Sequence, residues 1–302
     1  MSVLSLKADF KQHEKKMIHD MGLPDSFSHT VSEIYFPLAE KIQPLVKASN
    51  KPLLISINGA QGTGKSTLTA FLKLIFEVVF KLPTASFSLD DFYLTKSERK
   101  KLANDVHALL LTRGVPGTHD ISLLDDVIQR LRSGKEATVP RFDKSIDDRY
   151  PSNQWIHQKP VKLIIFEGWC NQSPVQNDEQ LLSPINKLEV EEDSSAVWRR
   201  YVNNQLHQYH KTVFSIAELT IMLKPPSFEC IYEWRELQED KLRKSENNSK
   251  LTVMNQEQVK KFIQHFERIT RHTISTLPDE VDILLPMNSQ HEIERIEIKN
   301  DE

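Results

Sequence analysis

Short apolar runs of five or six residues recur along the chain and alternate with longer amphipathic stretches. The runs at 53–57 (LLISI), 84–89 (TASFSL), 161–166 (VKLIIF) and 218–223 (ELTIML) each predict a largely buried strand. Two more strands are predicted near the C-terminus, within VDILLP and IERIEI. Strands that alternate with helices favour a parallel sheet with helices on both faces, so we expect an α/β fold.

Helical periodicity fills the segments between these runs. Residues 1–50 are predicted to form two helices, the second interrupted by Pro37 and Pro44. The stretch 121–134 is amphipathic, with Asp120 available as its N-cap and Gly134 at its C-terminal end. Further helices are expected after the first strand and at about 196–214, 229–244 and 256–275.

Two polar stretches lack this periodicity. Residues 171–195 are polar and acidic, with EVEED near their end, and are predicted to form a solvated loop. Residues 239–250 (EDKLRKSENNSK) carry many charges and few apolar anchors, which predicts a mobile connector.

The bulk composition limits the class of protein. The 302 residues are 39% hydrophobic and carry a net charge of −3, so we expect one domain over 1–302 and no nucleic-acid partner. Cys170 and Cys230 are too few for a disulfide framework or a zinc cluster. No apolar run suggests a membrane span. We expect a cytoplasmic protein that could also enter the nucleus. We expect it to be a monomer or a weak dimer.

Three of the chain's 8 glycines lie within the stretch GAQGTGKST. It follows an apolar strand, precedes a helix and fits G-x-x-x-x-G-K-[ST], the phosphate-binding P-loop. Glycines let backbone N–H groups point at phosphate oxygens, Lys65 would reach the β- and γ-phosphates, and the Ser66 hydroxyl would ligate Mg²⁺. The predicted nucleotide-binding residues are Gly59, Ala60, Gln61, Gly62, Thr63, Gly64, Lys65, Ser66 and Thr67.

Carboxylates follow two of the predicted strands. In such a sheet, ligands sit beyond the carboxyl ends of the strands, so these groups should face the γ-phosphate. We expect Asp90 to be the base that orients and deprotonates an acceptor hydroxyl. Asp91 and Tyr93 are placed on the acceptor side; Asp91 is the alternative base, it could touch Mg²⁺ through water, and the aspartate pair could instead cap a turn. Glu167 is predicted to bind Mg²⁺ or its waters.

Two further stretches between the second and third strands carry candidate acceptor ligands. They are RGVPGTHD (113–120) and RFDKSIDDR (141–149). Their cationic residues would suit a small anionic substrate, although ordinary surface charge is an equal alternative for each one taken alone. The candidates are Arg113, His119, Arg141, Lys144 and Arg149.

Signals of a GTPase are missing. The third strand ends FEGW rather than D-x-x-G, and the nearest match to the guanine-reading N-K-x-D is NKLE at 186–189.

With these motifs in place, the chain resembles the P-loop kinases of the phosphoribulokinase, uridine kinase and pantothenate kinase superfamily. Asp90 falls where that family carries its catalytic aspartate. SLDDFYLT, RGVPGTHD, RFDKS, IIFEGW and YEWRELQ are most similar to the plant-type D-glycerate 3-kinases and their fungal relatives.

The resemblance implies a five-stranded parallel core sheet, ATP and Mg²⁺, and a lid at about 225–250 that brings Arg235, or else Arg243, over the phosphates. It covers about residues 50–290. One departure is the segment after RFDKS, which is rich in glycine in the plant-type pattern and reads Ile146-Asp147-Asp148-Arg149 here.

We therefore expect an ATP-dependent small-molecule kinase, with D-glycerate as the best single guess for its acceptor. A kinase for another metabolite, such as a nucleoside or a pantothenate-like acid, is the first alternative. A nucleotide-binding sensor that has lost turnover is the second.

Overall fold

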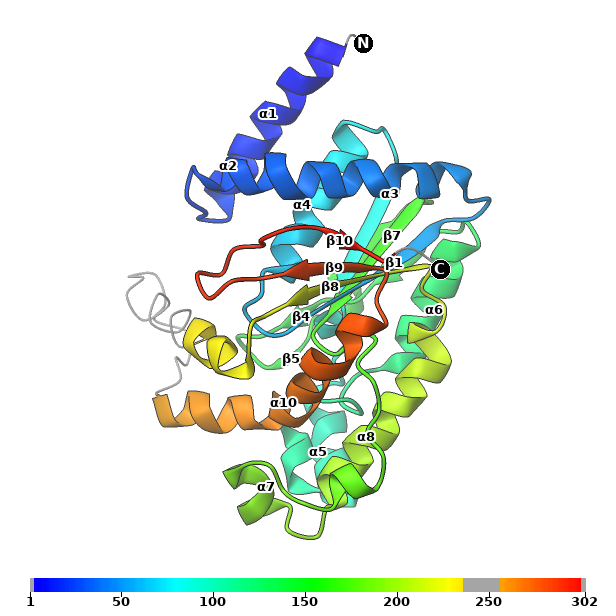
Figure 1. Ribbon diagram of the computed structural model, residues 1–302. Helices are drawn as coiled ribbons and strands as arrows, with labels where there is room; N and C mark the ends of the chain where they lie inside the picture. Colours follow the sequence, from blue (N-terminus) through cyan, green and yellow to red (C-terminus); the bar gives the residue numbers. More distant parts are fainter. Residues whose placement is uncertain (1–2, 236–255, 300–302) are drawn as a thin grey trace.

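A six-stranded sheet forms the centre of the protein in the computed structural model, which describes residues 3–235 and 256–299 (Figure 1). The strand order is β10-β9-β8-β1-β7-β2. Five strands run parallel, as expected, and β10 adds an antiparallel edge. The strands are β1 (Leu53–Gly59), β2 (Thr84–Ser88), β7 (Leu163–Gly168), β8 (Leu219–Lys224), β9 (Ile283–Pro286) and β10 (Glu297–Ile298). Two small hairpins pair β3 (Ala137–Val139) with β6 (Ile156–Gln158), and β4 (Phe142–Asp143) with β5 (Asp148–Arg149).

The strand register brings the predicted site residues to one edge of the sheet. Asn58 of β1 pairs with Gly168 of β7, and Ser88 of β2 pairs with Glu167 of β7. The carboxyl ends of the three strands therefore lie together. The loops that follow them begin from the same edge.

Helices cover both faces of this sheet, as the alternation of strands and helices predicted. The N-terminal region holds α1 (Val3–Asp20), α2 (Phe27–Thr30) and α3 (Phe36–Ala48). The remaining helices are α4 (Lys65–Val78), α5 (Lys96–Asp105), α6 (Ile121–Arg132), α7 (Lys187–Glu192), α8 (Val197–Tyr209) and α10 (Gln256–Thr276). Residues 228–235 are also helical, and the rest of the helix predicted at 229–244 lies outside the described residues. In the described part of the chain, no helix has the length and apolarity needed to cross a membrane.

The predicted interruption of the second N-terminal helix is wrong. The chain is helical from Phe27 to Ala48, with a π-helical turn at Val31–Tyr35 and Pro44 inside α3. Pro37 lies in the first turn of α3, directly after the π-helical turn, which shifts the hydrogen-bond register there. Burial of one apolar side of α3 outweighs the cost of Pro44, about 3 kcal/mol.

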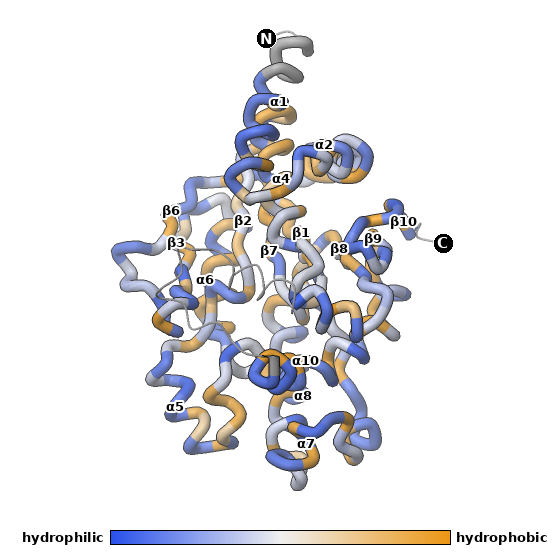
Figure 2. Tube along the Cα trace, turned by 90° about the vertical axis from the view of Figure 1, so that its left-hand side faces the viewer, coloured by the Kyte–Doolittle hydropathy of each residue, from blue (hydrophilic) through white to orange (hydrophobic). Residues whose placement is uncertain are grey.

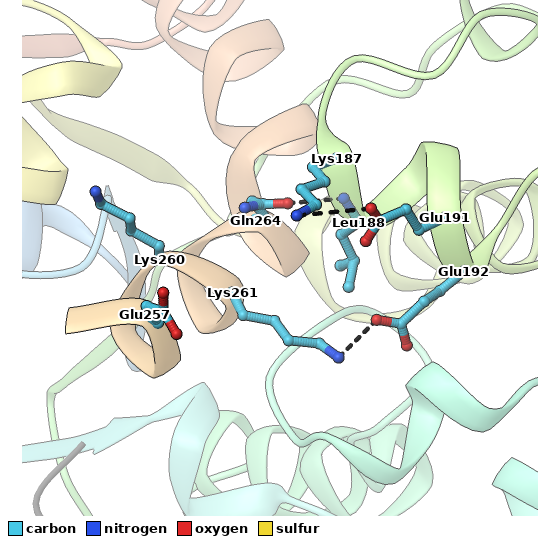
Figure 3. Close-up of a pocket in the computed structure, with 8 residues that line it drawn as sticks. All are labelled: Lys187, Leu188, Glu191, Glu192, Glu257, Lys260, Lys261 and Gln264. Carbon is cyan, nitrogen blue, oxygen red and sulfur yellow. Dashed lines mark hydrogen bonds and ion pairs between the residues drawn. The ribbon is translucent and has the colours of Figure 1, made fainter. Parts of the chain in front are cut away.

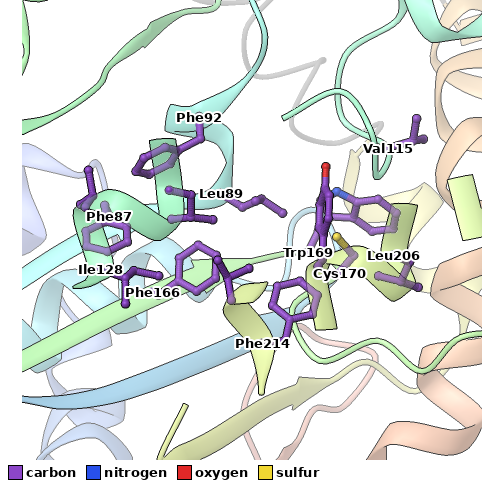
Figure 4. Close-up of a cluster of buried hydrophobic side chains, with 14 of the residues drawn as sticks. Phe87, Leu89, Phe92, Val115, Ile128, Phe166, Trp169, Cys170, Leu206 and Phe214 are labelled. Atoms are coloured by element: carbon purple, nitrogen blue, oxygen red, sulfur yellow. The ribbon is translucent and has the colours of Figure 1, made fainter. Parts of the chain in front are cut away.

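Two apolar cores form because neighbouring residues of each strand point to opposite faces of the sheet. Leu53, Ile55 and Ile57 of β1 pack with α1, α3 and α4, whereas Leu54 joins the other cluster. That second cluster draws on α6, α8 and α10 and includes Phe87, Leu89, Phe92, Phe166, Trp169 and Phe214 (Figure 4). Apolar segments accordingly line the inside of the trace on both sides of the sheet (Figure 2).

The segment 171–195 was predicted to be a solvated loop, and this is correct only in part, because most of its residues are exposed but some are not. It contains α7, and Glu189 and Asp193 of its acidic run are fully or almost fully buried. The Glu189 carboxylate pairs with Arg268 of α10 at 2.6 Å, and Asp193 pairs with Arg199 of α8 at 3.0 Å. These acidic residues are buried because an arginine neutralises each of them, Arg268 from 79 residues away and Arg199 from 6 residues away.

Candidate active site

The P-loop connects β1 to α4 and adopts a compact turn. Gly62 and Gly64 have φ angles of 81° and 84°, in the left-handed region that favours glycine. A side-chain carbon at Gly59 would lie only 2.5 Å from Oγ1 of Thr63, whose hydroxyl donates to the carbonyl of Ala60 at 2.9 Å. The glycine-rich sequence is therefore required by the turn, and the loop leads directly into the N-terminus of α4.

The polar side chains of this loop lie at the start of α4. Lys65 is its first residue, and its Nζ lies 3.5 Å from the carbonyl oxygen of Ala60. Ser66 and Thr67 follow in the first helical turn, while Gln61 is half-buried within the loop. The helix N-terminus favours negative charge, and Lys65 adds a full positive charge beside it.

Ser66 and Glu167 have the arrangement expected of a magnesium site. The Ser66 hydroxyl donates to Oε1 of Glu167 at 2.7 Å. Glu167 is 4% exposed, and its Oε2 is buried without a hydrogen-bond partner among the described residues. A buried carboxylate oxygen with no partner is costly, and a cation with its water ligands would satisfy it. These two side chains therefore fit Mg²⁺.

Asp90 and Asp91 have different surroundings. Both lie in the 3₁₀ turn Leu89–Phe92 that follows β2, where the Asp91 carboxylate accepts a hydrogen bond from the Ser88 N–H at 2.9 Å. Asp90 instead accepts from the Tyr93 hydroxyl at 2.6 Å and pairs with Lys144 at 2.7 Å. Asp91 thus caps the turn, which was one of the alternatives left open by the sequence, and Asp90 contacts Tyr93 and Lys144 instead.

Electrostatics separate the two aspartates further. Burial alone would raise the pKa of Asp90, but Lys144, the Tyr93 hydroxyl and the charge of Lys65 outweigh it and hold the pKa well below its usual value. Burial raises the pKa of Asp91 to about 6 against the hydrogen bond from Ser88, and repulsion by Asp90 and Glu167 adds to the rise. Asp90 is ionised at neutral pH, and the positive charge of Lys65 in the P-loop attracts its carboxylate.

Tyr93, whose hydroxyl contacts Asp90, packs against His119. Their rings stack with centroids 4.8 Å apart, and Nδ1 of His119 lies 2.9 Å from the hydroxyl of Tyr209. Burial lowers the pKa of His119 to about 3, so the imidazole is neutral at physiological pH. Its Nε2 is buried with no hydrogen-bond partner in the described part of the chain. His119 is therefore an uncharged, buried side chain with one ring nitrogen left unsatisfied.

The three predicted arginines play separate parts. Arg149 donates to the carbonyl of Tyr93 at 2.8 Å and to Asp120 at 3.3 Å, which ties its hairpin to the turn after β2. Arg113 pairs with Asp147. Arg141 is exposed, with its guanidinium 5.0 Å from the ring centre of Tyr150. Lys144 contacts Asp90 directly, and Arg113 lies over the Phe142 ring that packs against Tyr93. Among the described residues, Arg141 contacts Tyr150 instead.

Two residues of this region were missed. Arg99 of α5 is 1% exposed and donates to the carbonyls of Leu94, Leu111 and Asp147 at 3.2, 2.8 and 2.7 Å. Asp147 pairs with Arg99 as well as Arg113. The sequence around Arg99, KSERKK, looks like a solvated helix face, and only the departure after RFDKS drew attention to Asp147.

The described part of the predicted lid packs against the P-loop. Ala60 shares an apolar cluster with Phe228 and Ile231, and a side-chain carbon at Gly62 would lie 3.4 Å from Cβ of Trp234. Arg235 follows, with its guanidinium 6.0 Å from the ring centre of Phe262. The segment 239–250, with the alternative Arg243, lies outside the described residues.

A pocket between α7 and α10 is separate from this site (Figure 3). None of its lining residues is among the predicted site residues. Four of its charged residues form ion pairs, since Lys261 lies 2.6 Å from Glu192 and Lys187 lies 3.6 Å from Glu191. The candidate site is therefore the sheet edge that holds the P-loop and Asp90.

Comparisons with known proteins identify the family of the chain. Residues 54–174, which include the P-loop, both aspartates and Glu167, match the model of the phosphoribulokinase/uridine kinase family. An uncharacterized kinase of Schizosaccharomyces pombe, mug58, is 30% identical over 249 residues, covering 78% of this chain and 86% of its own.

Two relatives carry a more specific name. The chloroplastic D-glycerate 3-kinase of Arabidopsis thaliana is 32% identical over 202 residues, which cover 61% of this chain and 40% of that protein. The solved structure of a D-glycerate 3-kinase from Cryptococcus neoformans superposes with a TM-score of 0.71 at 25% identity. That match covers 87% of this chain and 99% of the other.

Proposed function

Because the chain belongs to the phosphoribulokinase/uridine kinase family, whose members are ATP-dependent phosphotransferases, we propose that it transfers the γ-phosphoryl group of MgATP to a hydroxyl of a small acid. D-glycerate is the best single candidate for that acid. The observation that carries the proposal is Asp90, an ionised carboxylate at the carboxyl edge of the sheet, held by Tyr93 and Lys144 and within the field of Lys65.

The nucleotide side of the mechanism uses the P-loop. Its backbone N–H groups and Lys65 would bind the phosphates, and Ser66 and Glu167 would hold Mg²⁺, directly or through its waters. The metal, when bound, offsets the negative charge of the β- and γ-phosphates. Ser66 and Glu167, now hydrogen-bonded to each other at 2.7 Å, would be the two side chains that hold the metal.

On the acceptor side, Asp90 accepts a hydrogen bond from the attacking hydroxyl and later takes its proton. A carboxylate with a lowered pKa is a weak base, but phosphoryl transfer proceeds through a loose transition state in which orientation matters more than early proton removal. Lys144 and Tyr93 hold Asp90 in one rotamer.

The charges beside Asp90 favour an acidic acceptor. Arg113 and Lys144 are both cationic, and neutral His119 presents a buried nitrogen that can bind a hydroxyl or a carboxylate oxygen. The two relatives named D-glycerate 3-kinase point to the same chemical class. A small hydroxy acid matches this set better than an uncharged nucleoside does.

An ADP-release assay tests the proposal. Purified protein with MgATP is offered D-glycerate, other hydroxy acids, pantothenate and nucleosides, one at a time. We expect turnover with a hydroxy acid, D-glycerate first. Turnover with nucleosides alone would reject the acidic acceptor, and ATP binding with no turnover on the whole panel would favour a sensor.

Asp90→Asn is the matched inactive variant for this assay. It keeps the side-chain shape and removes the proton acceptor, so turnover should fall by about 10²–10⁴ while MgATP affinity stays nearly unchanged. Asp91→Asn should cost less, because an amide oxygen can still accept the Ser88 hydrogen bond. A larger loss at Asp91 than at Asp90 would show that the base is assigned to the wrong carboxylate.

A further inference from the structure

The hairpin of β4 and β5 reaches into the candidate acceptor side at three points. Phe142 packs edge-on against Tyr93, with ring centres 5.0 Å apart. Lys144 pairs with Asp90 at 2.7 Å, and Asp147 pairs with Arg113. One hairpin therefore supplies the cation that pairs with Asp90, the proposed base. It also supplies the anion that pairs with Arg113, the arginine proposed to bind the acidic group of the acceptor.

The backbone of the hairpin holds Asp147 in this position. Its φ of 58° is in the left-handed region, which aspartate and asparagine tolerate better than most residues. The Asp143 carboxylate accepts from the N–H of Ser145 at 2.8 Å and closes the turn. Arg99 anchors Asp147 further by donating to its carbonyl at 2.7 Å and lying 3.0 Å from its carboxylate.

We propose that Asp147 is a specificity-determining residue. Its carboxylate forms an ion pair with the guanidinium of Arg113 at the position where the acidic group of the acceptor binds. The acceptor must therefore displace the Asp147 carboxylate from Arg113. The proposal rests on the proposed kinase activity toward a small acid. It makes the free site select for an anion, because only a negatively charged acceptor replaces the charge that Arg113 loses. A neutral alcohol would leave Arg113 paired with the hairpin and gain nothing from it.

The surroundings of the pair allow this exchange. The side chains of Arg113 and Asp147 are 25% and 32% exposed, so an incoming carboxylate can reach them. Arg113 lies near the Phe142 ring, at 5.5 Å from its centre, next to the tyrosine that contacts Asp90. Arg99 keeps three carbonyl partners after Asp147 moves its carboxylate. Displacement therefore leaves no buried arginine without hydrogen bonds.

Asp147→Asn tests the proposal, because asparagine accepts the same backbone conformation and removes only the competing charge. In steady-state assays with D-glycerate, KM should fall about fivefold. This is the effect expected when a partly exposed ion pair that competes with the substrate for Arg113 is removed. The kcat should stay unchanged because Asp90 and the P-loop are untouched. Calorimetry of D-glycerate binding in the presence of MgADP should show the same tightening.

Asp148→Asn is the matched control. It removes the same charge one residue further on, where the carboxylate accepts from the Lys96 N–H at 3.0 Å, and it should leave KM unchanged. Turnover with an equal or higher KM in Asp147→Asn would overturn the role of Asp147 and leave the proposed function standing. If D-glycerate binds without being turned over, the proposed function fails. Tighter binding of D-glycerate by Asp147→Asn, and not by Asp148→Asn, still supports competition between Asp147 and the ligand for Arg113. Absence of D-glycerate binding in every variant would overturn the role proposed for Asp147.

Discussion

Asp91 carries its charge where two other carboxylates, Asp90 and Glu167, already lie. Its pKa is raised to about 6, so the folded protein binds its proton more tightly than the unfolded chain does. The contribution of this proton to the free energy of unfolding is fully present below about pH 4 and is lost as the pH rises through 6. At neutral pH this carboxylate therefore opposes folding, and bound cations would relieve it.

Asp91→Asn should stabilise the nucleotide-free protein at pH 7 by roughly 1–3 kcal/mol and make no difference near pH 4. The amide keeps the capping oxygen and removes the repulsion. Chemical unfolding of both proteins across this pH range measures the difference. Asp126→Asn, an exposed change on α6, should show no such trend. Equal stability of Asp91→Asn and the parent protein at pH 7 would contradict the raised pKa.

At the scale of elements, α10 fixes α7 through the buried pair of Arg268 and Glu189. Arg268 also donates to the carbonyls of Gln180 and Ser183, at 2.8 and 2.7 Å. Glu189→Ala should cost about 3–5 kcal/mol of unfolding free energy, because it leaves a buried guanidinium without its counter-charge. Urea unfolding measures this loss.

Glu191→Ala on the same helix is the control. Its side chain is 57% exposed and lies 3.6 Å from Lys187, so its loss should stay within about 0.5 kcal/mol. Similar losses at Glu189 and Glu191 would mean that α7 is held by apolar contacts alone.

The same element shows what could and could not be predicted from sequence. The strands, the P-loop and the cap of α6 by Asp120 were predictable because their signals lie within a few residues of each other. The burial of Glu189 was not, since its partner lies 79 residues away and an acidic run looks solvated by itself. Arg99 was missed for the same reason. The sequence favoured Asp90 over Asp91 as the base, but that Asp91 caps the 3₁₀ turn became clear only from the structure.

For the whole molecule, nucleotide binding should appear as a gain in stability. At a MgATP concentration about 100 times its Kd, the unfolding free energy should rise by about 2.7 kcal/mol. Lys65→Ala should remove most of that gain at the same concentration, because the phosphates lose their direct cationic partner. Calorimetry of binding and of thermal unfolding measures both effects.

Lys47→Ala, an exposed change on α3, should keep the full gain. GTP should give a smaller gain than ATP, since the chain lacks a guanine-reading N-K-x-D. An undiminished gain in Lys65→Ala would reject the P-loop as the nucleotide site.

β1 is central in space but early in the chain. Leu53 pairs with Leu163 on one side, and Ile55 pairs with Leu219 on the other, so both neighbours leave the ribosome more than 100 residues later. At a synthesis rate of about 5–20 residues per second, roughly 5–20 s pass between the synthesis of β1 and that of its first pairing strand. During that time the helices of residues 3–78 can cover only one of its faces. The nascent chain should therefore be a client of chaperones that bind exposed apolar segments, until β7 has been synthesised.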